Sequence, residues 1–244
     1  MHELVKAFLI FLFSLNIVGC AQKSLVGQRK GVELVAEALN ARPLNKMIKF
    51  EAELGNTLFI LDNALKFTIS ESQKKINNGI RSELTVDYPF REGDEVYYSF
   101  DIFIPNSFKS DPHGRWSSLG QWHDQPNPDL SESWQTFPKR SPLVFIFDKI
   151  IDQEQVFGLN YGNEKIKLPL KVGQWNKLFF HFKWSLDYDG FLELKVNNGK
   201  KISFCGKNMH NSYQHYLKIG LYRHPNIIGA NYVYYRNLKI TSEK

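Results

Sequence analysis

The 244-residue sequence has few features of a disulfide framework, a metal centre or a nucleic-acid-binding surface. It contains only two cysteines, Cys20 and Cys205, and no close group of His, Asp and Glu with the spacing of metal ligands. The net charge of +6 arises without a dense basic run or a nucleic-acid motif. We therefore expect no nucleic-acid partner, no cofactor and no catalytic metal, while the sequence leaves a structural cation such as calcium open. A modest positive field would still help to gather a polyanion.

Long hydrophobic runs are also scarce, and the clearest one lies at the N-terminus. Residues 7–18 are apolar and follow Lys6, which is typical of a signal-peptide core and too short for a comfortable membrane span. Residues 17–20 (IVGC) resemble a bacterial lipobox. We predict a signal peptide over residues 1–19, a lipidated Cys20 and a tether over residues 20–44. The protein would then be an exported bacterial lipoprotein at the outer membrane, the cell surface or the periplasmic face. A plain signal peptide or a buried apolar helix is the alternative.

Lipidation of Cys20 would leave Cys205 without an intramolecular partner. Export would then bring no structural disulfide to the protein. Cys205 lies in the apolar, strand-like run 202–205, which predicts a buried and inert thiol.

Helical periodicity is confined to residues 31–41, where a short helix is expected. After Pro43 the chain consists of short alternating or apolar runs separated by turn residues, at 47–53, 58–61, 65–69, 95–105, 143–147, 175–184, 191–196 and 232–240. The run 143–147 is apolar throughout, and we expect it to be buried on both faces. The sequence has no internal repeat, no low-complexity segment and no interdomain linker. It therefore predicts one all-β domain, a β-sandwich or jelly roll, that acts as a monomer.

Three strand-like stretches carry most of the polar side chains that could perform chemistry: 81–84 (RSEL), 121–123 (QWH) and 216–223 (YLKIGLYR). Residues two apart in a strand share a face, so a polar row can lie opposite an apolar one. The polar rows consist of Arg81 and Glu83, then Gln121 and His123, and finally Tyr216, Lys218, Gly220 and Tyr222. Trp122 points the other way and is expected in the core. Together the rows predict one groove that offers a cation, an amide, an imidazole and a phenol.

The same residues carry a family resemblance. RSEL, Q-x-H and Y-x-K-x-G-x-Y, in this order, resemble the jelly-roll polysaccharide lyases of the alginate lyase-like group. Residues 120–124 (GQWHD), followed by residues 141–143 (SPL), are most similar to the heparin lyase I and glucuronan lyase branch. The resemblance extends from about residue 45 to the C-terminus. It implies a single β-jelly-roll domain, a concanavalin-like β-sandwich, over residues 45–244, and an acidic polysaccharide as substrate.

β-Elimination explains why such a site needs these residue types. A base takes the C5 proton of a uronate and an acid protonates the departing O4. The C5 proton is barely acidic beside a carboxylate anion, so the site must neutralise that carboxylate with fixed donors. The resemblance assigns His123 as the base and Tyr222 as the acid, or as both acid and base. It assigns Gln121 and Arg81 to the substrate carboxylate.

Other residues would surround the reacting sugar. The resemblance implies that Lys218 and Tyr216 line the subsite, and Lys218 could lower the pKa of Tyr222. Glu83 would bind substrate or orient Arg81, and His224 would lie at the groove edge. In glucuronate H5 and O4 lie on the same side of the ring, so one tyrosine could act as both base and acid. In iduronate or guluronate they lie on opposite sides, which favours a histidine base facing a tyrosine acid. The sequence contains both residues and does not choose.

The polar, proline-rich segment 124–141 is a long loop directly after His123, and we expect it to form a wall or lid over the groove. The predicted activity is cleavage of a glucuronan-like or heparin/heparan-like polymer to 4,5-unsaturated uronate ends. Glucuronan is preferred because heparin would favour a denser basic groove. Two alternatives remain: a non-catalytic carbohydrate-binding module, and a glycoside hydrolase. The hydrolase would need two carboxyl groups about 5–9.5 Å apart.

Overall fold

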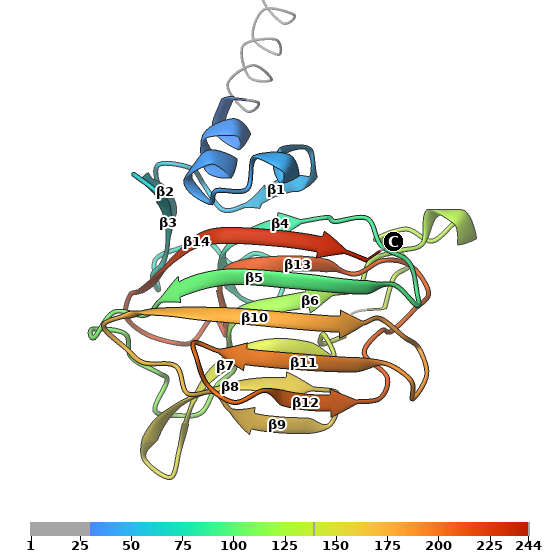
Figure 1. The fold of residues 1–244 in the computed structure, drawn as a ribbon. Helices are drawn as coiled ribbons and strands as arrows, with labels where there is room; N and C mark the ends of the chain where they lie inside the picture. Colours follow the sequence, from blue (N-terminus) through green and yellow to red (C-terminus); the bar gives the residue numbers. More distant parts are fainter. Residues whose placement is uncertain (1–29, 139, 244) are drawn as a thin grey trace, which may run out of the picture.

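The computed structural model describes residues 30–138 and 140–243, and in this part of the chain two antiparallel sheets of seven strands each pack as a sandwich (Figure 1). The predicted all-β jelly-roll fold is confirmed. The predicted signal peptide and Cys20 lie outside the described residues. None of the helices within the described ranges is long and apolar enough to span a membrane.

The first sheet contains all three stretches that were singled out in the sequence. Its strands, in spatial order, are β1 (Ile48–Glu51), β4 (Ile80–Val86), β13 (Tyr216–Arg223), β6 (Ser117–His123), β7 (Val144–Ile151), β8 (Glu154–Tyr161) and β9 (Glu164–Lys167). The central neighbours β4, β13 and β6 come from distant parts of the chain, so the site they form depends on the topology of the sheet.

The second sheet covers the apolar face of the first. Its strands, in spatial order, are β12 (Ile202–Cys205), β11 (Phe191–Val196), β10 (Trp175–Lys183), β5 (Glu95–Phe103), β14 (Asn231–Ser242), β3 (Ala64–Ile69) and β2 (Leu58–Leu61). Apolar side chains at alternate positions, such as Leu178, Phe180 and Phe182 of β10, are 0% exposed and form the core between the sheets. Trp122 of β6 is in this core, as predicted, with its ring 4.9 Å from that of Phe180.

Short helical segments close one end of the sandwich. The predicted short helix is present over residues 30–38, and the 3-10 helix η1 (Arg42–Met47) follows it. Val35 and Leu39 are fully buried, and the backbone N–H of Leu238 in β14 donates to the carbonyl of Leu39. Apolar side chains of this segment therefore belong to the core of the domain.

Two predictions about individual strands are wrong. The run 143–147 is not buried on both faces: Val144 and Ile146 are buried, whereas Phe145 and Phe147 are partly exposed on the open face of the first sheet. The reason is that β7 has the second sheet on one side only. Cys205 is exposed, because β12 is an edge strand that turns alternate side chains outward.

Candidate active site

The register of the three central strands brings the predicted site residues together. Tyr222 of β13 pairs with Arg81 of β4, and Lys218 of β13 pairs with Gln121 of β6. Tyr216 pairs with His123 at the end of β6. Because paired residues in neighbouring strands share a face, the three predicted polar rows become one surface.

Gly220 fits this surface for a steric reason. Its φ is +125°, and a Cβ built there would lie 2.3 Å from the carbonyl oxygen of Ser82 and 2.9 Å from Phe67. Only glycine tolerates this close approach in that conformation. The pairing of β13 with β6 shifts between Ile219 and Tyr222, next to this glycine. The motif Y-x-K-x-G-x-Y therefore encodes an irregular strand, in which the position of Gly220 has no room for a side chain.

A cavity of about 590 Å³ lies over these strands. Five of the eight predicted catalytic and substrate-binding residues line it, namely Arg81, Gln121, His123, Lys218 and Tyr222. None of the described residues that line this cavity is Asp or Glu. The paired carboxyl groups that glycoside hydrolysis requires are therefore not found in the part of its wall that the structure describes.

Arg81 is buried beneath Tyr222. Its guanidinium carbon lies 4.1 Å from the centre of the Tyr222 ring, a cation–π arrangement. One guanidinium nitrogen bonds Glu51 and lies 3.7 Å from a carboxylate oxygen of Glu83. Burial lowers the pKa of Arg81, but Glu83 and Glu51 together outweigh burial and raise it. A fixed positive charge is therefore held against one face of the phenol.

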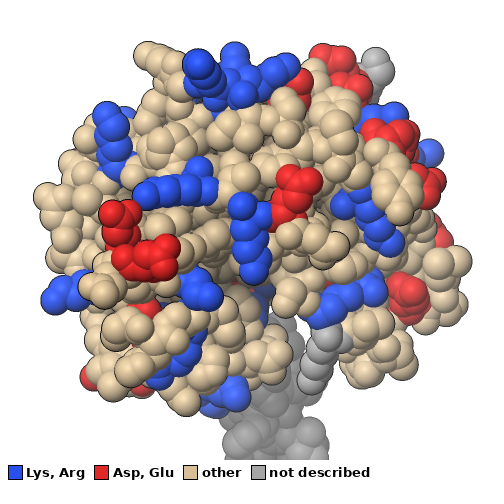
Figure 2. Space-filling view, turned by 90° about the horizontal axis from the view of Figure 1, so that it is seen from below, with Lys and Arg blue, Asp and Glu red and all other residues tan. Residues whose placement is uncertain are grey.

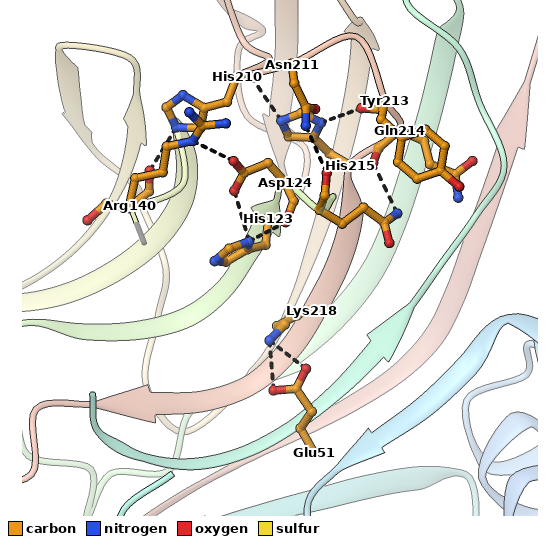
Figure 3. A network of polar contacts seen from close by, with 12 residues as sticks. Glu51, His123, Asp124, Arg140, His210, Asn211, Tyr213, Gln214, His215 and Lys218 are labelled. Atoms are coloured by element: carbon orange, nitrogen blue, oxygen red, sulfur yellow. Dashed lines mark hydrogen bonds and ion pairs between the residues drawn. The ribbon is translucent and has the colours of Figure 1, made fainter. Parts of the chain in front are cut away.

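Glu51 of β1 is a site residue that the sequence analysis missed. Its carboxylate lies 2.6 Å from Nζ of Lys218 and also bonds Arg81 (Figure 3 shows the pair with Lys218). Burial raises the pKa of Glu51, but Lys218 and Arg81 outweigh burial and lower it to about 2. Both cations at the floor of the cavity thus share one carboxylate.

Glu83 is 1% exposed and does not line the cavity. Gln121 Nε2 donates to it over 2.6 Å, so Glu83 fixes the amide of Gln121 from below, in addition to facing Arg81. Burial raises the pKa of Glu83, against the effect of Lys218 and Arg81. Glu83 therefore lies beneath the cavity lining, where it contacts Gln121 and Arg81.

His123 is held by its own neighbour. Its Nδ1 lies 2.6 Å from the carbonyl oxygen and 3.1 Å from a carboxylate oxygen of Asp124. Both partners accept hydrogen bonds, which favours the tautomer with hydrogen on Nδ1 and a free electron pair on Nε2. Tyr216, which is buried and outside the cavity lining, stacks on the imidazole with ring centres 5.7 Å apart. It supports His123 rather than lining the subsite.

His224 also lies outside the cavity lining, behind Trp116. The two rings are 5.9 Å apart, and His224 Nδ1 accepts a hydrogen bond from the backbone of Asn226. Trp116 itself lines the cavity and packs on the Tyr222 ring at 4.7 Å. Its place on a loop before β6 gave no sequence signal for this role.

The predicted wall over the groove is present. Trp134, Phe137 and Arg140 of the loop after His123 line the cavity, and the 3-10 helix η2 (Pro128–Leu130) lies in the same loop. The Arg140 guanidinium lies over Phe137 at 5.4 Å. The aromatic and cationic side chains of this loop were missed by the sequence analysis, which had only its length and proline content to indicate a function.

The described residues contain no group of three or more His, Cys, Asp or Glu side chains placed to hold a metal ion. On the face shown in Figure 2, Lys and Arg side chains are interspersed with Asp and Glu. The positive charge on that face is not gathered into one continuous patch.

The three central strands thus bring an imidazole, a phenol, an amide and buried cations to the open face of a β-sandwich. The chain belongs to the polysaccharide lyase family: the family model described as polysaccharide lyase matches residues 61–239. The protein is thus a polysaccharide lyase by family, as the sequence resemblance predicted. No curated protein sequence matches it.

Solved structures share the fold at low sequence identity. The endo-β-1,4-glucuronan lyase from the fungus Trichoderma reesei has a TM-score of 0.55 at 16% identity, over 79% of this chain and 86% of that one. Alginate lyase Aly36B has a TM-score of 0.53 at 13% identity, over 80% and 86%. The catalytic domain of a glycoside hydrolase family 131 protein from Coprinopsis cinerea has a TM-score of 0.50 at 14% identity, over 73% and 69%. The fold therefore occurs in both polysaccharide lyases and glycoside hydrolases.

Proposed function

We propose that this enzyme cleaves a uronic-acid polymer by β-elimination and leaves a 4,5-unsaturated uronate at each new end. One observation carries the proposal: the cavity is lined by His123, Tyr222, Gln121 and three cationic side chains, while none of its described lining residues is an acid. An elimination needs a base, an acid and carboxylate neutralisation, and it does not need the paired carboxyl groups of a hydrolase.

The proton transfers follow from the positions of two side chains. Nε2 of His123 takes the C5 proton, the C5–H electrons form the C4–C5 double bond, and the C4–O4 bond breaks. The Tyr222 hydroxyl gives its proton to O4. The phenolate that remains is stabilised by the Arg81 guanidinium held 4.1 Å from its ring, and water restores both residues afterwards.

Carboxylate neutralisation is the second requirement. The Gln121 amide is fixed by Glu83, so its orientation costs little when a substrate carboxylate arrives. Lys218 and Arg81 supply positive charge from the cavity floor, reduced by the Glu51 carboxylate that they share. Such a floor suits one carboxylate per sugar and offers little to a densely sulfated chain. This argument favours a glucuronan-like polymer over heparin.

A polymer also needs room on either side of the reacting sugar. A second cavity of about 660 Å³ shares Trp116, Ser117 and Phe145 with the first and continues over β7, β8 and β9. Phe147, Lys149 and Lys165 are among its lining residues. The two cavities together support binding of several consecutive sugars.

The test is absorbance of the 4,5-unsaturated uronate when the purified mature protein meets glucuronan, heparin, heparan sulfate, hyaluronan or alginate. We expect a rise on a glucuronate polymer that falls by at least about 10²-fold in His123→Ala and Tyr222→Phe. Tyr188→Phe, at a ring that is 93% exposed, is the matched control and should change nothing. New reducing ends without absorbance would mean hydrolysis. Unchanged binding by the variants and no turnover by any form would mean a binding module.

Lipidation at Cys20 is a separate proposal, supported by the IVGC sequence at residues 17–20. In a bacterial host, the full chain should incorporate labelled fatty acid and sediment with membranes, whereas Cys20→Ser should do neither. Equal labelling of both forms would overturn the lipobox assignment.

A further inference from the structure

Asp124 joins two parts of the site that lie 16 residues apart in the sequence. It follows β6 directly, and its side chain is 0% exposed. One carboxylate oxygen lies 3.1 Å from His123 Nδ1, and the other accepts a hydrogen bond from Arg140 Nε over 2.6 Å. Figure 3 shows the three side chains in a row, Arg140 to Asp124 to His123. A fully buried carboxylate is retained at such a position only with charged or polar partners on its oxygens.

Arg140 differs from the other cations of the cavity. Its Nε is bound to Asp124, but within residues 30–138 and 140–243 its two Nη groups have no hydrogen-bond partner. The side chain is 31% exposed and lines the cavity. Arg81 and Lys218, by contrast, both bind Glu51. The Nη groups of Arg140 are therefore a planar pair of donors available to a carboxylate.

We propose that Asp124 and Arg140 form a positioning pair for the elimination, an inference that rests on the proposed function. Asp124 holds His123 with hydrogen on Nδ1, so that Nε2 is free to take the C5 proton. The same carboxylate holds Arg140 with its Nη groups at the cavity wall, where they bind a carboxylate of the uronate chain. Asp124 is a positioning residue, and Arg140 is a substrate-binding residue.

The charge of Asp124 serves both tasks. Burial raises its pKa, but His123 and Arg140 outweigh burial and lower it to about 2, so the carboxylate is ionised over the working range of a lyase. When His123 accepts the C5 proton it becomes a cation, and an adjacent anion stabilises that cation. Arg140 compensates the same anion in the resting site.

Several other titratable or charged groups face His123 and Asp124 from neighbouring elements, and each stays unchanged in the variants used below. They are Tyr216 and Lys218 of β13 and His210 and His215 of the segment before β13. His215 is buried, and burial lowers its pKa to about 4, so it is neutral at neutral pH. A change in kcat that follows the removal of the Asp124 charge therefore reports on the Asp124–His123 pair.

The first test is Asp124→Asn, which keeps the shape and removes the charge. We expect kcat to fall by about 10²-fold with little change in KM. Without the anion, the imidazolium that forms when His123 takes the C5 proton loses its adjacent counter-charge, so the effect falls on kcat. The matched control is Asp129→Asn on the same loop, where the side chain is exposed, and it should change neither quantity.

The second test is Arg140→Lys beside Arg140→Gln. We expect KM to rise by about tenfold in the glutamine variant and by less in the lysine variant, which keeps the charge and loses the fork. A carboxyl-reduced polymer cannot undergo the elimination and serves as a ligand only, and its binding affinity should be the same for the wild type and both variants. Arg91→Gln, at an exposed arginine that is not among the residues lining either cavity, is the control.

A direct measurement separates this inference from the proposed function. Nitrogen-15 NMR of the imidazoles reports which nitrogen of His123 carries hydrogen, with or without turnover. Hydrogen on Nδ1 in the wild type and a larger share of the other tautomer in Asp124→Asn, where the backbone carbonyl still accepts from Nδ1 but the anion is gone, would support the inference even if no polymer is cleaved. Elimination by the wild type, together with an unchanged kcat and tautomer in a folded Asp124→Asn, would overturn the inference and leave the proposed function intact.

Discussion

At the scale of single residues, the site is a set of charges that compensate one another. Arg81 and Lys218 both pair with Glu51, and the Gln121 amide donates a hydrogen bond to Glu83. Nδ1 of His123 contacts the carbonyl oxygen of Asp124. Ion pairs with little water contact are strong only while both partners are present. The cations predicted to meet the substrate therefore also hold the site in shape.

Glu51 makes the stability of the protein depend on pH. Its pKa in the folded state, about 2, lies below its ordinary value of 4.5, so its contribution is present above pH 4.5 and lost as pH falls to 2. The upper limit of this contribution is about 3 kcal/mol. Glu51→Gln should therefore lower the free energy of unfolding at pH 7, and the difference from wild type should shrink towards pH 2.

Urea denaturation of the two proteins at a series of pH values measures this effect. Glu33→Gln, at an exposed glutamate of the N-terminal helix, is the control and should match the wild type at every pH. A difference between Glu51→Gln and wild type that stayed constant with pH would assign the loss to packing and not to charge.

At the scale of elements, β13 is the strand that every part of the site touches. It pairs with β4 on one side and with β6 on the other, and its irregular segment around Gly220 lets the side chains of both neighbours meet. The loop after His123 then closes one side of the cavity. The strands set the positions of the predicted reacting groups, and the loop adds Trp134, Phe137 and Arg140 to the cavity wall.

Gly220→Ala tests the irregular strand. The new Cβ would lie 2.3 Å from a backbone oxygen, and the alanine would have to adopt a φ of +125°. We therefore expect the free energy of unfolding to fall by at least about 2 kcal/mol. Gly55→Ala is the matched control, because Gly55 has a φ of +83° and nothing within 4 Å of a Cβ. It should cost about 1 kcal/mol by chemical denaturation. Equal losses for the two variants would mean that the close approach of β4 is not significant.

At the scale of the whole molecule, the open face of the first sheet is longer than one sugar site. The second cavity lies beyond Trp116 and Phe145, over the strands that end the sheet. Its lining combines aromatic rings and lysines with three acidic residues, Asp148, Asp152 and Glu154. A chain bound across both cavities would be held at several sugars at once.

Lys165→Gln tests the second cavity, since Lys165 lines it and is exposed. We expect kcat/KM on long chains to fall by about fivefold, the effect of one exposed charge contact, with no change on the shortest cleavable oligosaccharide. Lys177→Gln on β10 of the second sheet is the control and should leave both substrates unaffected. An equal loss on short and long substrates would show that Lys165 acts at the reacting sugar.

The sequence by itself determined the fold class and which side chains share a face, because the two-residue period of a strand is a local property of the backbone. That period was sufficient to place Gln121 beside His123 on one strand and Lys218 beside Tyr222 on another, whereas the pairing of β13 with β4 and β6 brought these rows together with Arg81. The local pattern could also be misleading, because the exposure of Cys205 and of one face of β7 depends on which strands lie beside and above them.

Only the tertiary structure decided the electrostatics of the site. Glu51 meets Lys218 because β1 pairs with β4 in one register, and Arg140 meets Asp124 because a loop folds back over β6. No periodic pattern in the sequence predicts either contact, because turns separate the residues and the packing of the domain sets the path of those turns. A charge that compensates another is visible only when the distance between them is known.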